Sequence, residues 1–295
     1  MNKLTLGTAQ LGMKYGINNK HGKPLIHESL SILEGAYNHN IKSFDTAYSY
    51  GDSEKVLGTW IEKSGFLDIN LTSKSLSLNK QKVHKSQVEK KLRDSLEHSL
   101  RRMHINKLNH YLIHDFMDVK IYGDEIFKVL EKLKKESLID RYGCSIYDME
   151  ELEYISDYEI GSIQIPGNIL NRGILDSKRL GQMKKEGTSV FVRSVFLQGL
   201  FFMNIEDIPK PLKDVKVYLQ KLRTMVKESE FTIADVALNY VRNHPNTDSV
   251  VFGVESLNQL TEIISINKHN EINPEVIKEE FSGVSSRLFD PRYWG

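Results

Sequence analysis

The chain has 295 residues, with 40 Lys and Arg against 39 Asp and Glu, and it contains no long block of like charge. This balance argues against a surface that binds a polyanion, so we expect no nucleic-acid partner. The single cysteine, Cys144, excludes an internal disulfide, and no apolar run is long enough to cross a membrane or to act as a secretory signal. We therefore expect a soluble, cytoplasmic protein.

Short apolar segments predict strands, and they alternate along the chain with segments of helical spacing. The expected strands cover residues 3–7, 41–44, 70–75, 107–114, 140–146, 161–165, 190–195 and 249–254. Apolar residues recur at helical spacing over residues 27–36, from 53 onward, and over 86–103, 126–135, 149–155, 180–185, 213–228, 233–243 and 257–267. Asp52 or Ser53 is the expected N-cap of the second helix.

Eight consecutive βα units predict a (β/α)8 TIM barrel, a closed parallel barrel inside a ring of helices, rather than an open sheet. Such a barrel commonly runs to roughly 250 residues as one unit. No Pro-, Gly- or Ser-rich linker divides this chain. We expect a single domain over residues 1–295, with an insertion at about 200–231 after the seventh strand and a C-terminal tail at about 281–295.

Four polar residues fall at or just beyond the carboxyl ends of three neighbouring predicted strands. Asp45 and Tyr50 follow the second strand, Lys74 lies at the end of the third, and His114 ends the fourth. Parallel barrels keep their chemistry at this end. Each residue also has an ordinary structural explanation, because an Asp after a strand often caps a helix, a strand-end Lys is usually solvated, and Tyr and His often only pack. Their joint placement favours a shared catalytic role.

Carbonyl reduction is the chemistry that needs these four side chains together. A hydride that reaches a carbonyl carbon puts negative charge on the oxygen, which then needs a proton donor and a hydrogen-bond donor. Tyr50 is the expected donor, and a nearby Lys74 ammonium is expected to lower the tyrosine pKa from its ordinary value of about 10. Asp45 would hold Lys74 charged. His114 would orient the substrate oxygen as a neutral imidazole.

Several motifs of this chain resemble, in kind and order, those of the aldo-keto reductase family. They are DTAYSYG with SEKVLG, TSKS, YLIHD, YGCS, SIQIPGNILNRG, RSVFLQGLF and SVVFGVESLNQLTE, spread over about residues 6–264. The resemblance implies a hydride donor, NADPH or NADH, bound at the barrel mouth, with no metal. Consistently, no GxGxxG fingerprint follows a strand. The resemblance also implies a catalytic tetrad of Asp45, Tyr50, Lys74 and His114, with Tyr50 as general acid/base.

The same resemblance implies three groups of residues around the cofactor. Ser145 and Gln164 would hydrogen-bond the nicotinamide carboxamide, with Asn168 close to that pocket. Backbone amides suit an anion, so the pyrophosphate and adjoining ribose would meet Ser194, Leu197, Gln198 and Gly199. The adenosine end would meet Gly253, Val254, Ser256, Gln259 and Glu262. Taken alone, this last stretch is simply a strand, an N-cap and a helix.

The family resemblance implies an aldehyde or ketone as substrate. Arg193 and the lysines of the first βα loop suggest a polar or sugar-derived carbonyl compound. The tail is rich in aromatic residues and arginine, so it suits closing over the mouth as well as packing on the helical ring. The expected pocket walls are Tyr15, Tyr48, Phe116, Asn168, Arg193 and the tail from Arg287 to Trp294.

Three positions depart from the family pattern. Arg193 stands where many relatives have an aromatic ring that stacks on the nicotinamide, so its guanidinium would stack there or reach an anionic substrate. Ile146 replaces an Asn that commonly follows the serine. The loop expected near the 2′-phosphate of NADPH holds Glu255 and Gln259 but no cation, and a carboxylate suits an unphosphorylated ribose. We therefore hypothesise that NADH is used at least comparably to NADPH.

Two other classes of function remain as alternatives. The first is a nucleotide-binding regulatory or interaction protein on an aldo-keto reductase scaffold, which would bind the cofactor with little or no turnover. Arg193 and Ile146 favour it, whereas the intact tetrad argues against it. The second is a metal-dependent hydrolase on the same barrel, which would need several histidines and carboxylates at strand ends. Only His114, Asp115 and Asp45 qualify.

Overall fold

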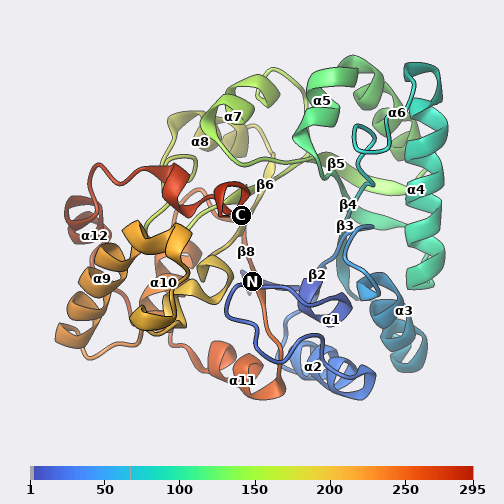
Figure 1. The fold of residues 1–295 in the computed structure, drawn as a ribbon. Coiled ribbons are helices and arrows are strands. Elements are labelled where there is room, and N and C mark those ends of the chain that lie inside the picture. Colours follow the sequence, from blue (N-terminus) through green and yellow to red (C-terminus); the bar gives the residue numbers. More distant parts are fainter. Residues whose placement is uncertain (1–2, 67, 295) are drawn as a thin grey trace.

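The computed structural model describes residues 3–66 and 68–294, and within these ranges the fold is a closed parallel barrel of eight strands (Figure 1). Each strand pairs in parallel with the next, and β1 pairs with β8 to close the ring. The expected barrel and each of its expected strands are confirmed. The strands are β1 (Leu4–Gly7), β2 (Ser43–Asp45), β3 (Asn70–Lys74), β4 (Leu108–Ile113), β5 (Ile139–Ser145), β6 (Ser162–Pro166), β7 (Ser189–Arg193) and β8 (Ser249–Gly253).

Helices follow the strands and cover the outside of the barrel (Figure 1). In α4, the side chains of Val88, Leu92, Leu96 and Leu100 are buried, because a repeat of four places them on one face of the helix. The helices are α1 (Ala9–Gly12), α2 (Ile26–Asn38), α3 (Ser53–Ser64), α4 (Val88–Met103), α5 (Phe116–Tyr122), α6 (Asp124–Lys135), α7 (Met149–Ile155), α8 (Lys178–Lys185), α9 (Lys216–Glu228), α10 (Ile233–Arg242), α11 (Leu257–Ser265) and α12 (Pro274–Glu280).

The short helices α1, α5 and α12 were not predicted from the sequence. Each spans at most two turns, so its apolar residues do not repeat often enough to reveal helical spacing. Two of them have caps that are recognisable only once the chain is folded. Asp115 accepts a hydrogen bond from the N–H of Met117 at the start of α5, and Asn273 accepts one from the N–H of Glu275 at the start of α12.

The register of the strands aligns the carboxyl ends on which the site is built. Gly7 of β1 is level with Asp45 of β2, and Asp45 is level with Thr72 of β3. On the far side of the ring, Ser145 at the end of β5 is level with Gln164 of β6. Side chains from several strands can therefore meet at one mouth of the barrel.

The chain between β7 and β8 is long. It passes through the 3₁₀ turns η2 (Leu197–Phe202), η3 (Ile205–Asp207) and η4 (Lys210–Val215) before α9 and α10. This is the stretch in which the sequence predicts an insertion, at residues 200–231.

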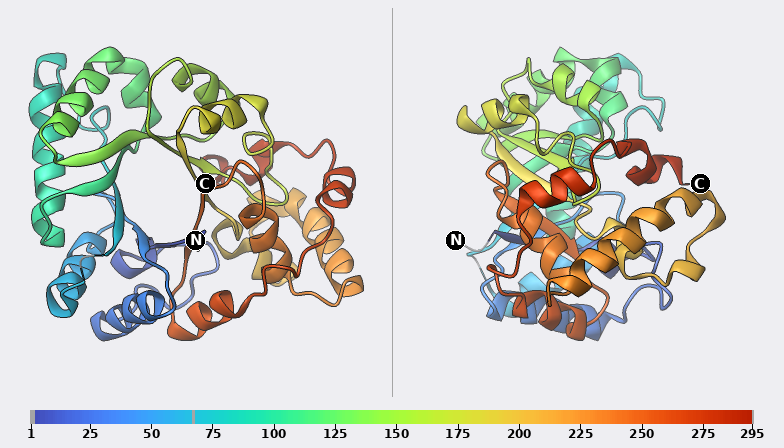
Figure 2. Two further views of the ribbon diagram at one scale, coloured as in Figure 1. Left: turned by 180° about the vertical axis from the view of Figure 1, so that it is seen from behind. Right: turned by 90° about the vertical axis from the view of Figure 1, so that its left-hand side faces the viewer.

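After α12, the C-terminal segment forms η5 (Ser286–Phe289) and η6 (Pro291–Tyr293). In the right-hand view of Figure 2, the N-terminus and the C-terminus lie at opposite sides of the molecule. Phe289 is buried and anchors the segment. Over residues 3–66 and 68–294, no helix is both long enough and apolar enough to cross a membrane.

Candidate active site

A buried ion pair joins β2 and β3 inside the barrel. Lys74 Nζ lies 2.6 Å from Asp45 Oδ1, and both side chains are almost fully withdrawn from solvent. Lys74 also donates to the carbonyl of Thr46 at 2.9 Å, and Gln164 Nε2 donates to Asp45 Oδ2 at 2.8 Å from across the barrel. Both oxygens of Asp45 are thereby occupied, which is what a buried carboxylate requires. Burial lowers the pKa of Lys74, and the Asp45 carboxylate opposes that effect.

Tyr50 lies in a tight turn after β2. The N–H of Tyr50 donates to the carbonyl of Ala47, and the N–H of Ser53 donates to the carbonyl of Tyr50, each at 3.0 Å. Gly12 of α1 packs directly beneath this turn, where a Cβ would lie 1.9 Å from the Tyr50 carbonyl oxygen. Only glycine therefore allows the two backbones to approach so closely. This contact holds Tyr50 at the barrel mouth.

The Tyr50 ring lies close to two other members of the predicted tetrad, Lys74 and His114. Lys74 Nζ is 5.1 Å from the centre of the ring, and the His114 ring meets it edge-on with centroids 5.6 Å apart. Asp45 reaches the group through its ion pair with Lys74. The structure thus brings together, at one mouth, the four residues that the sequence singled out.

The pKa of Tyr50 is raised above its ordinary value, first by burial and then by the Asp45 carboxylate, while the Arg193 guanidinium acts in the opposite direction. The expectation that Lys74 would lower this pKa is not met. The reason is that Asp45 neutralises Lys74 at 2.6 Å, so the pair presents little net positive charge to the phenol. Tyr50 is therefore a protonated phenol at neutral pH.

His114 is a neutral imidazole. Burial lowers its pKa to about 3, and the nearby cations Lys74 and Arg193 add to the effect. Its Nδ1 lies 3.2 Å from the hydroxyl oxygen of Ser49. When Ser49 donates this hydrogen bond, the ring proton of His114 is on Nε2. The imidazole then has an N–H to offer to a ligand.

A cavity of about 430 Å³ opens beside Asp45 and Tyr50, and it is large enough for a small organic ligand. Lys74 and His114 do not line it, but both contact Tyr50. Of the residues expected to hold substrate, Tyr15 lines it. The expected cofactor residues that line it are Gln164, Arg193, Ser194, Gln198, Gly199, Gly253, Val254, Gln259 and Glu262.

The loop after β7 has an unusual backbone where it borders the cavity. Ser194, Leu197, Gln198 and Gly199 all have positive φ, at 66°, 51°, 55° and 87°. Left-handed residues in close succession form a concave backbone whose N–H groups can surround an anion. Three of the four are not glycine, so this conformation carries a strain that tertiary contacts must maintain. Two of these N–H groups bond within the loop, since that of Leu197 donates to the carbonyl of Ser194 at 3.0 Å and that of Gly199 to the carbonyl of Phe196 at 2.9 Å.

The first βα loop packs against this concave segment. The N–H of Ile17 donates to the carbonyl of Gln198 at 3.1 Å, and Asn18 lies so close to Gly199 that an added Cβ would be 2.8 Å from the Asn18 Cβ. The two loops therefore support each other along one side of the cavity.

Some expected cofactor residues lie outside the cavity lining, and they serve the structure nearby. Ser256 caps α11 by accepting a hydrogen bond from the N–H of Gln259 at 3.2 Å. The side chain of Leu197 is fully buried and its N–H donates to the carbonyl of Ser194 at 3.0 Å, and the side chain of Ser145 is also buried.

Other residues outside the lining are those expected at the substrate pocket, namely Tyr48, Phe116, Asn168 and Trp294. Asn168 donates to the carbonyl of Ser194 at 3.2 Å and accepts from the N–H of Leu170 at 2.9 Å. It therefore ties the loop after β6 to the loop after β7. Trp294 donates through Nε1 to the carbonyl of Leu288 at 3.1 Å, within the C-terminal segment.

Acidic side chains border the far part of the cavity. Glu255 and Glu262 belong to its lining, and burial raises the pKa of Glu255. The N–H of Glu255 donates to Gln259 Oε1 at 2.8 Å, which fixes the loop after β8. Among the described residues that form this lining, Arg193 is the single Lys or Arg. The acidic end thus has no Lys or Arg among the described lining residues, although His21 acts electrostatically on Glu255.

Sequence reasoning missed several residues of the cavity. Gln10 reaches the loop after β8, where a Cβ on Gly253 would come within 2.3 Å of its Oε1. Asn18, Phe202 and Ala234 come from the first βα loop, from η2 and from the first turn of α10. No motif marks them, because they reach the cavity only through the path of long loops.

Glu54, in the SEKVLG motif, has a structural role. Its side chain is buried, and it accepts hydrogen bonds from Ser73 Oγ at 2.8 Å and from Arg102 Nη1 at 3.3 Å. Arg102 in turn donates to the carbonyl of Gly51 at 2.7 Å. Glu54 therefore joins α3 and α4 to the turn that carries Tyr50. Within the described ranges, no three His, Cys, Asp or Glu side chains gather as a metal site would require.

Comparisons with known proteins agree with this geometry. A sequence model described as "Aldo/keto reductase family" matches residues 3–280. The chain is 24% identical to the uncharacterized oxidoreductase YqkF of Bacillus subtilis, covering 94% of this chain and 95% of that protein. It is 22% identical to D-arabinose 1-dehydrogenase of Saccharomyces cerevisiae, covering 96% and 86%. The fold is similar to that of aldo-keto reductase AKR11C1 of Bacillus halodurans in its holo form, with a TM-score of 0.72 at 23% identity over 96% and 92% of the two chains.

Proposed function

This chain belongs to the aldo/keto reductase family and is an oxidoreductase, and on that premise we propose that it reduces an aldehyde or ketone to an alcohol with NADH or NADPH. The observation that carries the proposal is the meeting of Tyr50, Lys74, Asp45 and His114 beside a cavity of ligand size. Bound reduced nicotinamide would supply the hydride.

Tyr50 is proposed to give the proton. Hydride addition turns the carbonyl oxygen into an alkoxide, which is a stronger base than a phenolate and so takes the proton from Tyr50. The raised pKa of Tyr50 supports this role, because the phenol still carries its proton at neutral pH. The Arg193 guanidinium, which acts to lower the pKa of Tyr50, would then help to stabilise the phenolate that remains, while Lys74 Nζ lies 5.1 Å from the ring centre. Asp45 keeps the buried ammonium in place.

His114 is proposed to orient the carbonyl oxygen. Its pKa of about 3 keeps the ring neutral, so it would act as a hydrogen-bond donor and not as a cation. The edge-on contact with the Tyr50 ring supports this role, since it brings both groups to one place. The carbonyl oxygen would accept one hydrogen bond from each.

The cofactor is proposed to lie along the cavity. The concave backbone from Ser194 to Gly199 would border the pyrophosphate, with N–H groups other than those of Leu197 and Gly199, which bond within the loop, as the donors. Gln164 uses its Nε2 on Asp45, so its Oε1 would accept from the nicotinamide carboxamide. The adenosine end would face Glu255 and Glu262, where a 2′-phosphate would meet repulsion. We therefore infer that NADH binds at least as well as NADPH.

Two further points concern the class of substrate and the alternative of a protein without turnover. The name of the yeast relative, D-arabinose 1-dehydrogenase, supports a sugar-derived compound as substrate. A regulatory or interaction protein that binds the cofactor with little or no turnover would instead make use of Arg193 and Ile146, the positions that depart from the family pattern. The intact tetrad favours the enzyme.

The direct test mixes the purified protein with NADH or NADPH and follows nicotinamide absorbance against a panel of aldehydes, ketones and sugars. We expect turnover of at least one carbonyl class with NADH. Tight cofactor binding without turnover of any panel member would support the regulatory alternative. Absence of both binding and turnover would refute both.

A further inference from the structure

Arg193 is a half-buried cation that borders the cavity without a carboxylate partner. Its Nη2 donates to the carbonyl of Ile146 at 3.1 Å, and its Nη1 lies 3.4 Å from the hydroxyl of Ser194. A guanidinium has five N–H donors, so these two contacts leave most of its capacity unused. Within residues 3–66 and 68–294, no Asp or Glu oxygen lies within ion-pair distance of it.

Tyr147, just beyond β5, holds Arg193 in place. The Arg193 Cζ lies 4.2 Å from the centre of the Tyr147 ring, and the Arg292 Cζ lies 4.4 Å from the same centre. The Tyr147 ring thus contacts both a cation that borders the cavity and a cation of the C-terminal segment.

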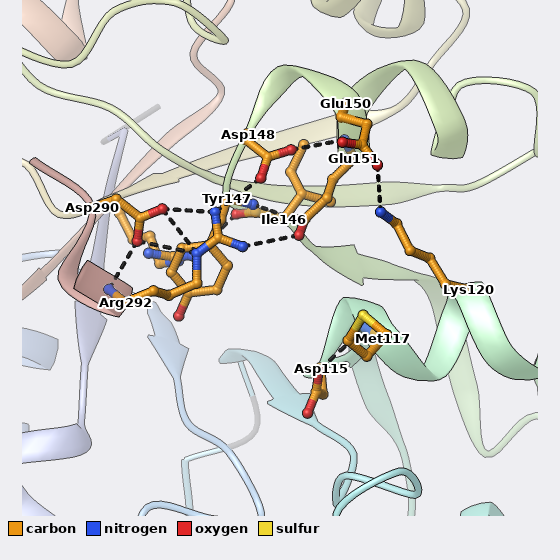
Figure 3. A network of polar contacts seen from close by, with 11 residues as sticks. Asp115, Met117, Lys120, Ile146, Tyr147, Asp148, Glu150, Glu151, Asp290 and Arg292 are labelled. Carbon is orange, nitrogen blue, oxygen red and sulfur yellow. Dashed lines mark hydrogen bonds and ion pairs between the residues drawn. The ribbon is translucent and has the colours of Figure 1, made fainter. Parts of the chain in front are cut away.

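Arg292, unlike Arg193, has carboxylate partners, three against its single charge. It bonds Asp290 at 2.7 Å, Asp148 at 2.9 Å and Glu151 at 3.1 Å. These carboxylates raise the pKa of Arg292. Figure 3 shows the network, in which the guanidinium of Arg292 lies against the Tyr147 ring and reaches the acidic residues at the start of α7. The C-terminal segment is thus fastened to the loop after β5.

The charges beside Tyr50 therefore do not balance. Lys74 pairs with Asp45 and Arg292 with three carboxylates, whereas no carboxylate of the described residues lies within ion-pair distance of Arg193. Arg193 acts electrostatically on Tyr50, Tyr15 and Lys74, so its charge is felt where the carbonyl group would be bound. A planar guanidinium with N–H groups to spare is suited to a carboxylate or phosphate, which it can bind with two parallel hydrogen bonds.

We propose that Arg193 binds an anionic group, a carboxylate or a phosphate, carried by the carbonyl substrate, and that Arg292 acts as a positioning residue by holding Tyr147 against it. This inference rests on the proposed carbonyl reduction. If the nicotinamide ring stacked on the face of the Arg193 guanidinium, the N–H groups in the plane of the guanidinium would still be available to bind the substrate.

The test compares matched substrates that differ in charge. One pair is 4-carboxybenzaldehyde and its methyl ester, and the other is glyceraldehyde 3-phosphate and glyceraldehyde. We expect the charged member of at least one pair to have the higher kcat/KM, by roughly 10- to 100-fold, which is the range for a hydrogen bond to a charged group. The pair that responds distinguishes carboxylate from phosphate. Equal kcat/KM within both pairs would overturn the proposal.

Substitutions at Arg193 test whether this residue binds the anionic group of the substrate. Arg193→Gln is expected to bring the ratio of charged to neutral kcat/KM close to one, and Arg193→Lys to restore part of it, because lysine keeps the charge but not the fork. The ratio within a pair cancels any general effect of the substitution on the cofactor. A ratio that stays at the wild-type value in Arg193→Gln would overturn the proposal.

Arg292→Gln tests the positioning role. It is expected to raise KM for the charged substrate several-fold more than for the neutral one, with kcat nearly unchanged, and Arg292→Lys to recover part of the loss. Arg93→Gln is the matched control, because Arg93 also bonds a carboxylate, that of Glu136, but lies on α4 away from the cavity. Equal effects of Arg292→Gln on both substrates would show that Arg292 serves only stability.

A binding measurement separates failure of this inference from failure of the proposed function. If neutral aldehydes are reduced and charged ones are not preferred, the function stands and the inference falls. If nothing is reduced, calorimetry of the NADH-saturated protein with 4-carboxybenzoate decides the matter. Binding that is weakened at least tenfold in Arg193→Gln supports the anion site, and equal binding by both proteins rejects it.

Discussion

Lys74 Nζ and Asp45 Oδ1 lie 2.6 Å apart, with exposed fractions of 0% and 4% for the two side chains. Two charges removed from water in this way are stable only as a pair, because each alone would keep its full desolvation cost. The pair also presents Lys74 to the Tyr50 ring. Stability and the proposed chemistry therefore both involve the Lys74–Asp45 pair.

Lys74→Met is therefore expected to destabilise the protein by about 3–5 kcal/mol, since Asp45 would remain as an unpaired buried charge. Chemical denaturation followed by circular dichroism measures the change. Lys90→Met is the control, because Lys90 pairs with Asp94 at an exposed site and should contribute little. A loss no larger than that of the control would mean that the buried pair does not stabilise the fold.

Tyr50→Phe is expected to lower kcat by about 10²- to 10⁴-fold, the usual contribution of a general acid, while leaving cofactor affinity nearly unchanged. The reason is that the phenol is asked to act only on the reacting oxygen. Tyr48→Phe removes a hydroxyl two residues away that does not line the cavity, so it should retain activity. Near wild-type turnover in Tyr50→Phe would remove the proton-donor assignment.

The expected pH dependence of reduction follows from the shifted pKa values of His114 and Tyr50. His114 has a pKa lowered to about 3, so it is neutral well above that value, and the raised pKa of Tyr50 keeps the phenol protonated beyond its ordinary value. We therefore expect kcat/KM for reduction to be flat between about pH 5 and pH 9. An acid limb with a midpoint near the ordinary histidine value of about 6.5 would contradict the neutral, buried His114.

Glu255→Lys is expected to shift cofactor preference towards NADPH. A cation at the acidic end of the cavity would pair with the 2′-phosphate, so the Kd for NADPH should fall roughly tenfold or more, with a smaller change for NADH. Fluorescence titration measures both constants. Glu228→Lys adds the same charge on exposed surface at the end of α9 and is the control. An equal response in both variants would point to a general charge effect.

Gly12→Ala is expected to impair catalysis through the backbone. Its Cβ would lie 1.9 Å from the Tyr50 carbonyl oxygen, so the turn that carries Tyr50 must move. Because small displacements of a catalytic group are costly, we expect kcat to fall about 100-fold. Gly173→Ala, whose Cβ would meet no atom within 4 Å, should behave as the wild type. Normal kcat in Gly12→Ala would mean that this contact does not position Tyr50.

The barrel and the members of the candidate tetrad could be predicted because their signals are local. A strand or helix can be predicted from the spacing of its own apolar residues. The topology of a parallel barrel then brings the carboxyl ends of the strands together. Asp45, Lys74 and His114 follow from that rule, since each sits at or next to the end of a strand. Tyr50 lies in the short turn that follows β2, so its position also follows from the end of that strand.

Only the tertiary structure decided the rest, because it depends on residues that meet from distant parts of the chain. Gln10 and Ala234 reach the cavity by the path of loops that no periodicity encodes. The direction of the Tyr50 pKa shift depends on burial and on the Lys74–Asp45 distance, which no spacing of residues reveals. The contacts of the Tyr147 ring with Arg193 and Arg292 likewise join segments that are adjacent only in the folded chain.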